Sequence, residues 1–200
     1  MRKKVFSCFV LGIVIVLSYV YAHIDKNHYV YDKTADTSTY VGTHIVVDGE
    51  FVKQSFVASD DTIDGINLKI AVYGNPENLI LQYCILDSDD AIVAEAEVAG
   101  TELQHNKFNH LQLSTIENTK GNLYTLMLGV KHADEQNGLG FYIEPGSKGN
   151  MTLLVREQET EGALVTRIIS HRFDVETFVV LLGIIVFIAG FMKVLDKYFR

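Results

Sequence analysis

Carboxylates are the most numerous side chains in this 200-residue sequence that could take part in chemistry. Asp87, Asp89 and Asp90 stand together in one short run between two apolar stretches. Hard cations such as Ca²⁺ prefer several carboxylate oxygens close together, so these three residues are candidate metal ligands. The run lacks the glycine and the distal glutamate of an EF-hand loop, and a solvated hairpin turn is the simpler explanation. We therefore expect no metal ion and no cofactor.

A second pair of carboxylates, Glu95 and Glu97, alternates with apolar residues and so lies on one face of a predicted strand. Two carboxylates can hydrolyse a glycosidic bond when they flank it inside a groove. The sequence contains no nucleophile elbow, phosphate-binding loop or zinc-ligand spacing, and its seven histidines are scattered. We expect a protein that is not an enzyme. A carboxylate-dependent envelope hydrolase or transferase is the alternative.

Aromatic side chains are the candidates for binding a sugar, because a ring face packs against the apolar face of a pyranose. The chain has no tryptophan, so tyrosine and phenylalanine must supply any such ring. The candidate ligand-binding residues are Tyr73, Tyr83, Phe141 and Tyr142. Packing in the core or on a sheet surface is the alternative role for all four.

The charge distribution limits the class of partner. Between His23 and Asp174 there are 11 lysines and arginines against 23 aspartates and glutamates, which gives this region a net charge of −12. Nucleic-acid binding requires lysines and arginines that contact phosphates. The acidic region is therefore not expected to bind nucleic acid.

The elements that must position these side chains are short strands. Ile63–Tyr73 alternates between apolar and polar residues, with Ile66, Leu68, Ile70 and Val72 on one face. Asp48-Gly49 predicts a hairpin between strands at Thr43–Val47 and Phe51–Ala58. Six further strands are expected at Leu79–Leu86, Ile92–Val98, Phe108–Leu113, Leu123–Val130, Gly140–Ile143 and Met151–Val155, and a last one at Ala163–Ile169. This spacing predicts a mainly β fold, a single antiparallel β-sandwich.

The strand pattern resembles a known class of module. The residues that carry the resemblance are Gln54-Ser55-Phe56, Gly65-Ile66, Leu68–Tyr73, Leu79–Asp87 and Tyr124-Thr125-Leu126. They are similar to jelly-roll or galactose-binding-like β-sandwich modules of bacterial surface and glycan-handling membrane proteins. The resemblance implies a jelly-roll-like fold that binds carbohydrate or packs against a partner. The sequence departs from the sugar-binding members of this class because it contains no tryptophan, the best stacking platform for a sugar ring.

Both ends of the chain are apolar enough to suggest membrane segments. Residues 1–22 are expected to be an N-terminal transmembrane anchor, or a signal peptide cleaved after Ala22. Residues 23–42 are expected to be a stalk, residues 43–170 the sandwich, residues 175–195 a C-terminal transmembrane helix and residues 196–200 a cytoplasmic tail. Basic residues precede the first segment and follow the second. By the positive-inside rule these flanks stay in the cytoplasm, which places the sandwich between them outside it.

These expectations combine into one function. The sequence predicts a protein of the plasma membrane whose main domain is an extracytoplasmic, membrane-anchored binding or scaffolding module at the cell surface. The expected partners are the membrane itself, envelope glycan, or a glycan-assembly membrane protein. An accessory subunit of a membrane complex is a further alternative, in which the helices form the working surface.

Overall fold

The structure, a computed structural model, describes residues 2–147 and 151–199, without the side chains of residues 2–11, 196 and 197. The chain divides into two compact units. The helical unit contains Met1–Asp25 and His171–Arg200, and the sandwich unit contains Lys26–Ser170. Each unit is described by itself.

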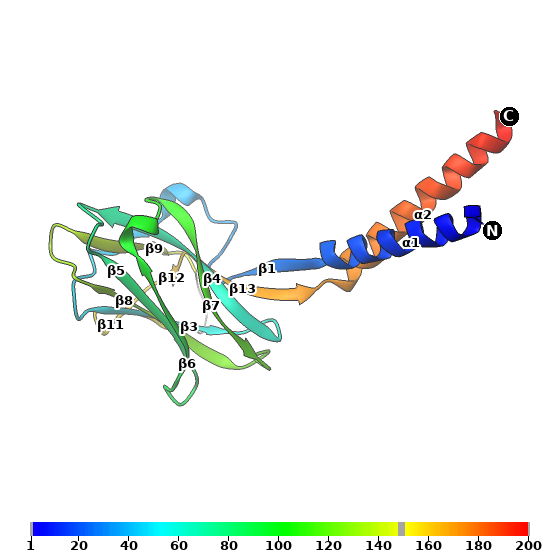
Figure 1. Ribbon diagram of the computed structural model, residues 1–200. Helices are drawn as coiled ribbons and strands as arrows, with labels where there is room; N and C mark the ends of the chain where they lie inside the picture. The colour runs from blue at the N-terminus through cyan, green and yellow to red at the C-terminus, as the bar shows by residue number, and fades with distance from the viewer. Residues whose placement is uncertain (1, 148–150, 200) are drawn as a thin grey trace. The chain divides into compact units, whose positions relative to one another are not determined.

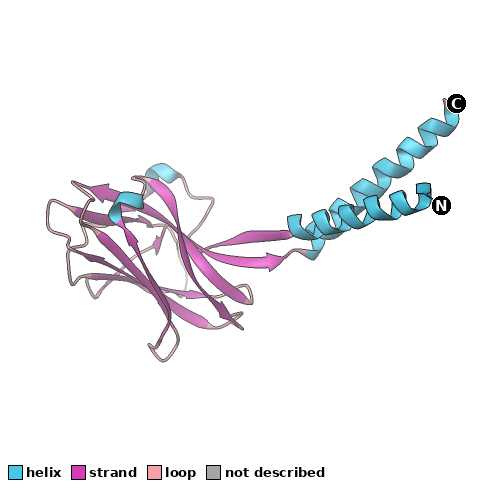
Figure 2. Cartoon of the chain, in the orientation of Figure 1, coloured by secondary structure: helices cyan, strands magenta, loops and turns pink. Residues whose placement is uncertain are grey.

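The sandwich unit is mainly β, with two antiparallel sheets (Figure 1, Figure 2). The first sheet has the order β1-β13-β4-β9-β12, with β2 paired to β9 and β7 paired to β4. Its strands are β1 (His23–Tyr29), β2 (Val41–Gly42), β4 (Thr62–Tyr73), β7 (Lys107–Glu117), β9 (Gly138–Glu144), β12 (Ala163–Leu164) and β13 (Thr166–Phe173).

The second sheet has the order β11-β10-β3-β8-β5-β6. Its strands are β3 (Phe51–Val57), β5 (Ile80–Leu86), β6 (Ile92–Ala99), β8 (Leu123–Lys131), β10 (Leu153–Val155) and β11 (Gln158–Thr160). Two short 3₁₀ segments, η1 (Thr37–Thr39) and η2 (Gly100–Glu102), lie in the connections. The prediction of a mainly β, antiparallel sandwich is confirmed.

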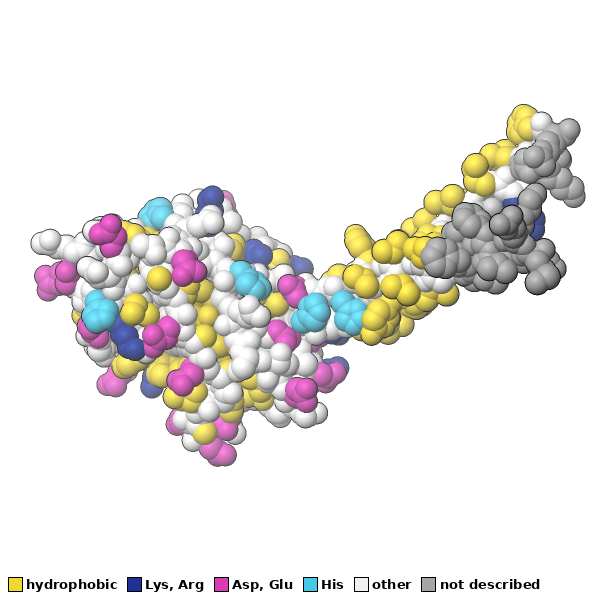
Figure 3. Space-filling view, viewed as in Figure 1, with side chains coloured by type: hydrophobic (Ala, Val, Ile, Leu, Met, Phe, Trp, Pro, Cys, Tyr) yellow, Lys and Arg dark blue, Asp and Glu magenta, His cyan; other side chains and the backbone are white. Residues whose placement is uncertain are grey.

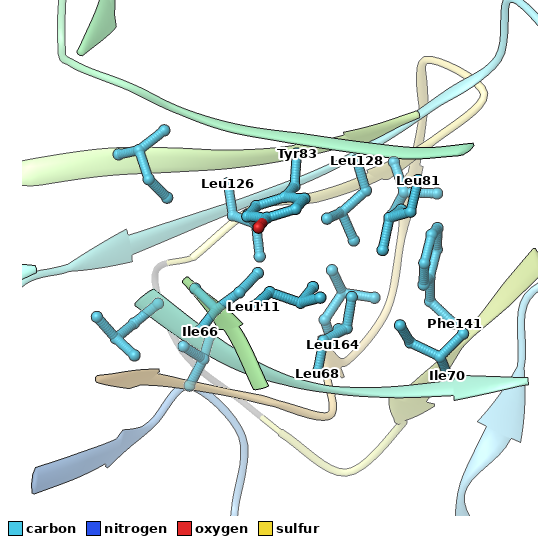
Figure 4. Close-up of a cluster of buried hydrophobic side chains, with 14 of the residues drawn as sticks. Ile66, Leu68, Ile70, Leu81, Tyr83, Leu111, Leu126, Leu128, Phe141 and Leu164 are labelled. Atoms are coloured by element: carbon cyan, nitrogen blue, oxygen red, sulfur yellow. The ribbon is translucent and has the colours of Figure 1, made fainter. Parts of the chain in front are cut away.

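The core lies between the inner faces of the two sheets. On β4, Ile66, Leu68 and Ile70 are fully buried, as their alternation predicted. Leu81 of β5 and Leu126 of β8 are equally buried and belong to the same hydrophobic cluster (Figure 4). Because the side-chain period of a strand is two, every residue between these core positions faces outward.

The hairpin predicted around Asp48-Gly49 is wrong. Residues 43–47 form no strand apart from an isolated bridge between Val46 and Leu139, which belongs to the first sheet. The following strand, β3, instead pairs with β8 and β10 in the second sheet. The turn therefore transfers the chain from one sheet to the other. A local turn signal specifies the reversal but not which strands pair beside it.

The predicted stalk, residues 23–42, contains sheet structure. Strand β1 lies beside β13, and β2 pairs with β9 through Val41 and Ile143. Between these strands the chain packs down on the sandwich, since Val30 and Tyr31 are both buried. The polar sequence of β1 gave no alternation to indicate this, because its side chains are largely exposed.

The helical unit contains α1 (Arg2–Tyr21) and α2 (Val175–Tyr198), which are continuous in sequence with β1 and β13. Val175–Leu195 is long and apolar enough to cross a membrane. Within the described side chains of α1, the apolar stretch Gly12–Tyr21 is shorter than a membrane crossing requires. Of the two expected membrane helices, only α2 therefore meets the requirement in the described residues.

Candidate functional site

The outer face of the second sheet carries a groove of about 370 Å³, which is within the range of small-ligand sites. We call it the outer-sheet groove. It lies across β3, β8, β5 and β6, the four strands at the centre and one edge of that sheet. The outward side chains that line it are Phe51, Gln82, Cys84, Ile92, Glu95, Glu97, Met127 and, where there is no side chain, Gly129.

The hollow exists because a glycine stands in the middle of a strand. Gly129 pairs with Phe51 on one side and with Gln82 on the other. A Cβ at Gly129 would lie 2.9 Å from Cε1 of Phe51, so the ring rests directly over the bare backbone. Phe51 is nevertheless 42% exposed and presents a ring at one end of the groove. Glycine inside a strand is typical of places where another group approaches the backbone closely.

The opposite end of the groove is acidic. Glu97 of β6 accepts hydrogen bonds from Gln82 Nε2 at 2.9 Å and from Lys131 Nζ at 2.8 Å. The hydrogen bond from Lys131, followed by that from Gln82, lowers the pKa of the Glu97 carboxyl. Glu95, two residues earlier on the same face, is exposed and makes no hydrogen bond or ion pair with another described residue. The groove thus offers one fixed carboxylate and one whose acceptor positions are open.

Cys84 contributes an unreactive thiol to the floor. Its side chain is buried, and burial followed by the neighbouring Glu95 charge raises the pKa of the thiol. A nucleophilic cysteine requires the opposite shift. Cys84 therefore contributes a small hydrophobic surface to the groove.

Comparisons with known proteins assign no family to this chain. No protein-family model matches it, and no curated protein matches it.

Three solved structures have a partial likeness to the chain. A structure of infectious bursal virus derived T=1 particles matches over 72% of this chain and 38% of its own, at 13% identity and a TM-score of 0.32. A structure of infectious bursal disease virus, Gx strain, matches over 74% and 36%, at 15% identity and a TM-score of 0.31. FlgD from P. aeruginosa matches over 60% and 95%, at 10% identity and a TM-score of 0.24. The chain thus spans about two fifths of the viral proteins, and scores this low carry no functional argument.

The four aromatic residues predicted to contact sugar do not form one face. Phe141 and Tyr83 point into the core (Figure 4), where Phe141 is completely buried and the Tyr83 hydroxyl donates to the Gln112 carbonyl at 2.8 Å. Buried rings offer no face to a ligand, so these two have the alternative role of core packing. Tyr73 and Tyr142 are half-buried on the outer face of the first sheet. Of the four, only Tyr83 contributes to the lining of the outer-sheet groove, although its ring points into the core.

The acidic turn after β5 is held by its own backbone. Asp87 Oδ1 accepts hydrogen bonds from the Asp89 amide at 2.9 Å and the Ala91 amide at 3.0 Å. Asp90 has a φ of 60°, which completes the tight reversal. Throughout the described ranges, no group of three or more His, Cys, Asp or Glu side chains is placed to hold a metal ion. The hairpin-turn interpretation accounts for Asp87, Asp89 and Asp90.

The groove residues escaped sequence reasoning apart from Tyr83, Glu95 and Glu97. Phe51 and Gln82 are far apart in sequence and become neighbours only through the β3-β8-β5 register. One local signal was present: Gly129 interrupts an otherwise regular strand with a residue that strands disfavour. The glycine indicates that another group lies close to the backbone of this strand. Which group that is depends on the strand register, which the sequence did not reveal.

Proposed function

We propose that this protein is a membrane-anchored binding module that displays a jelly-roll-like β-sandwich outside the cytoplasm. Its ligand is a neutral or amine-bearing sugar of the cell envelope, bound in the outer-sheet groove. The observation that carries the proposal is the combination of an exposed Phe51 ring, the Gln82 amide and two carboxylates around one hollow.

Each part of the groove matches one part of such a ligand. The apolar face of a pyranose packs on an aromatic ring, for which Phe51 is available. Hydroxyl and ammonium groups donate hydrogen bonds to carboxylates, for which Glu95 has open acceptor positions. An amine-bearing sugar also suits the acidic sandwich, whose charge favours cationic over anionic ligands.

The same geometry favours binding over hydrolysis. Glu95 and Glu97 lie two residues apart on one strand, so both would contact the same side of a sugar. A glycosidase places its two carboxyl groups on either side of the scissile bond, and its general acid has a raised pKa. The pKa of Glu97 is lowered by its hydrogen bonds with Lys131 and Gln82, which is the opposite of the shift that a general acid requires.

The anchor is the second part of the proposal. α2 begins at Val175, with only Asp174 between it and the end of β13, and its apolar side chains are broadly exposed. Hydrophobic residues cover the described part of the helices, whereas acidic residues are spread over the visible face of the sandwich unit (Figure 3). A module that is anchored in a membrane and faces water requires an apolar anchor and a polar domain of this kind.

A glycan array with the full chain in lipid nanodiscs tests the ligand class. We expect retention on glucosamine-containing glycans and a loss of about tenfold in affinity, roughly 1.4 kcal/mol, for Phe51→Ala. Val57→Ala is the matched control, since Val57 is an exposed residue of the same strand face outside the groove. Equal affinities for the two variants, or retention on anionic glycans only, would contradict the proposal.

A further inference from the structure

The outer face of the first sheet carries cations enclosed by aromatic rings. Arg167 of β13 has its guanidinium carbon 3.8 Å from the Phe108 ring centroid and 4.9 Å from that of Tyr29. Lys69 of β4 has its ammonium 4.8 Å from the Tyr142 centroid and 5.4 Å from that of Tyr40. We call these six residues the cation–aromatic patch. All of them lie in the sandwich unit.

The two cations of the patch have no counter-ion among the described residues. Neither Lys69 nor Arg167 makes an ion pair, although acidic residues outnumber basic ones about two to one in this part of the chain. Nε of Arg167 is shielded from solvent and has no hydrogen-bond partner. The Glu144 carboxylate is engaged with the Gly146 amide and the Ser147 hydroxyl. Donors of both cations are therefore left without acceptors from the protein.

The two cations are also close neighbours. Arg167 is directly opposite Asn67 in the β4-β13 ladder, and Lys69 follows Asn67 by two residues on the same face. The Cα atoms of diagonal neighbours of this kind are about 7–8 Å apart, within reach of long side chains. The like charges of two such neighbours repel each other, and an anion placed between them would be attracted to both.

The rings determine how such an anion is held. The Phe108 and Tyr29 rings both lie against the guanidinium and leave less of it open to a ligand. The edge of a guanidinium presents parallel N–H groups that match the two oxygens of a carboxylate or phosphate. The Asn67 amide donates to Asn27 Oδ1 at 2.7 Å, and its own oxygen makes no hydrogen bond with either cation.

We propose that the cation–aromatic patch binds an oxyanion, a carboxylate or phosphate group, between the Lys69 ammonium and the Arg167 guanidinium. The oxyanion is either a free ion or a group carried by a sugar. A polyanion is disfavoured by the net charge of −12 between His23 and Asp174, so the ligand bears few charges. This site is independent of the outer-sheet groove, which lies on the other sheet.

Thermal unfolding of the full chain in nanodiscs, titrated with inorganic phosphate and separately with glucuronate, tests the proposal. A ligand that binds only the folded state raises the Tm with a saturating concentration dependence. We expect this rise in the wild type with at least one of the two anions, and its disappearance in Lys69→Met, which keeps an unbranched side chain but removes the charge. Lys120→Met removes an exposed lysine in a turn and serves as the control that retains the rise.

Each outcome bears on the proposal. A rise with phosphate alone assigns the site to a free ion, and a rise with glucuronate but not with glucose assigns it to an acidic sugar. Should Lys69→Met prove too unstable, Arg167→Lys replaces it, with an expected weakening of about tenfold because the planar fork is lost. Equal rises in wild type and variant reflect general salt stabilisation and overturn the proposal, as does the absence of any rise.

Discussion

At the scale of the residue, neighbouring side chains along β4 differ in how much they contribute to stability, because they point to opposite faces of the sheet. Leu68 is completely buried, whereas Lys69 is half-buried on the outer face. Leu68→Asp should lower the free energy of unfolding by more than about 4 kcal/mol, because the carboxylate would be buried without a partner. Lys69→Asp should cost about 1 kcal/mol, through the lost contacts with Tyr40 and Tyr142. Urea unfolding of both variants measures the difference, and similar losses would mean that the face assignment is wrong.

Gly129 is the residue on which the groove depends. In Gly129→Ala the new Cβ would lie 2.9 Å from Cε1 and 3.1 Å from Cδ1 of Phe51, so the ring must move. The ring is exposed and free to shift, and alanine is favoured over glycine in a strand by about 0.5–1 kcal/mol. We therefore expect unchanged thermal stability with about tenfold weaker sugar binding. Unchanged affinity in a titration of this variant would argue against the groove as the site.

At the scale of the element, the sequence predicted strands better than their partners. The alternation of β4 and the apolar run of β5 were sufficient to place both strands. The hairpin at Asp48-Gly49 failed, and the strand within residues 23–29 was not predicted, for one reason: the partners of Val46 and β1 lie more than 90 residues away. The groove was unpredictable on the same ground, since the register of four strands brings Phe51, Gly129 and Gln82 together.

Glu50, in the turn that connects the two sheets, predicts that the stability of the fold depends on pH. Burial would raise the pKa of Glu50, but hydrogen bonds from the Val47 amide at 3.2 Å, Arg156 Nε at 2.6 Å and His44 Nε2 at 3.1 Å lower it overall. A group with a depressed folded-state pKa stabilises the fold above its unfolded pKa, about 4.3 for Glu, and loses this contribution as the pH falls through the folded value. The Tm of Glu50→Gln should therefore lie below wild type at pH 7.

The same comparison at acid pH supplies the control. Once Glu50 is protonated, the wild-type carboxyl and the variant amide are both neutral, so the two Tm values should converge as the pH falls through the lowered folded-state pKa of Glu50. Scanning calorimetry between pH 3 and 7 follows the difference. A Tm difference that stays constant across this range would show that the Glu50 charge does not stabilise the turn.

At the scale of the whole molecule, the proposal requires that the two units experience different solvents. In a cell, a cysteine at exposed Lys120 should react with a membrane-impermeant thiol reagent, whereas a cysteine at Tyr198, beyond the apolar stretch of α2, should react only after permeabilisation. Both variants are made with Cys8 and Cys84 replaced by alanine, so that each carries one thiol. Labelling of the Tyr198 position in intact cells, with protection of Lys120, would reverse the orientation.

The central claim is that the outer-sheet groove is where the ligand binds, and the four methionines of the chain allow a direct measurement. Met127 lines the groove, whereas Met151 is exposed outside it. We would label the methionine methyl groups with ¹³C in the full chain in nanodiscs and titrate a glucosamine trisaccharide while recording methyl NMR spectra. The account predicts a saturating shift of the Met127 methyl signal with Met151 unmoved. A Met127 signal that stays fixed while the sugar binds, or equal shifts at both methionines, would contradict it.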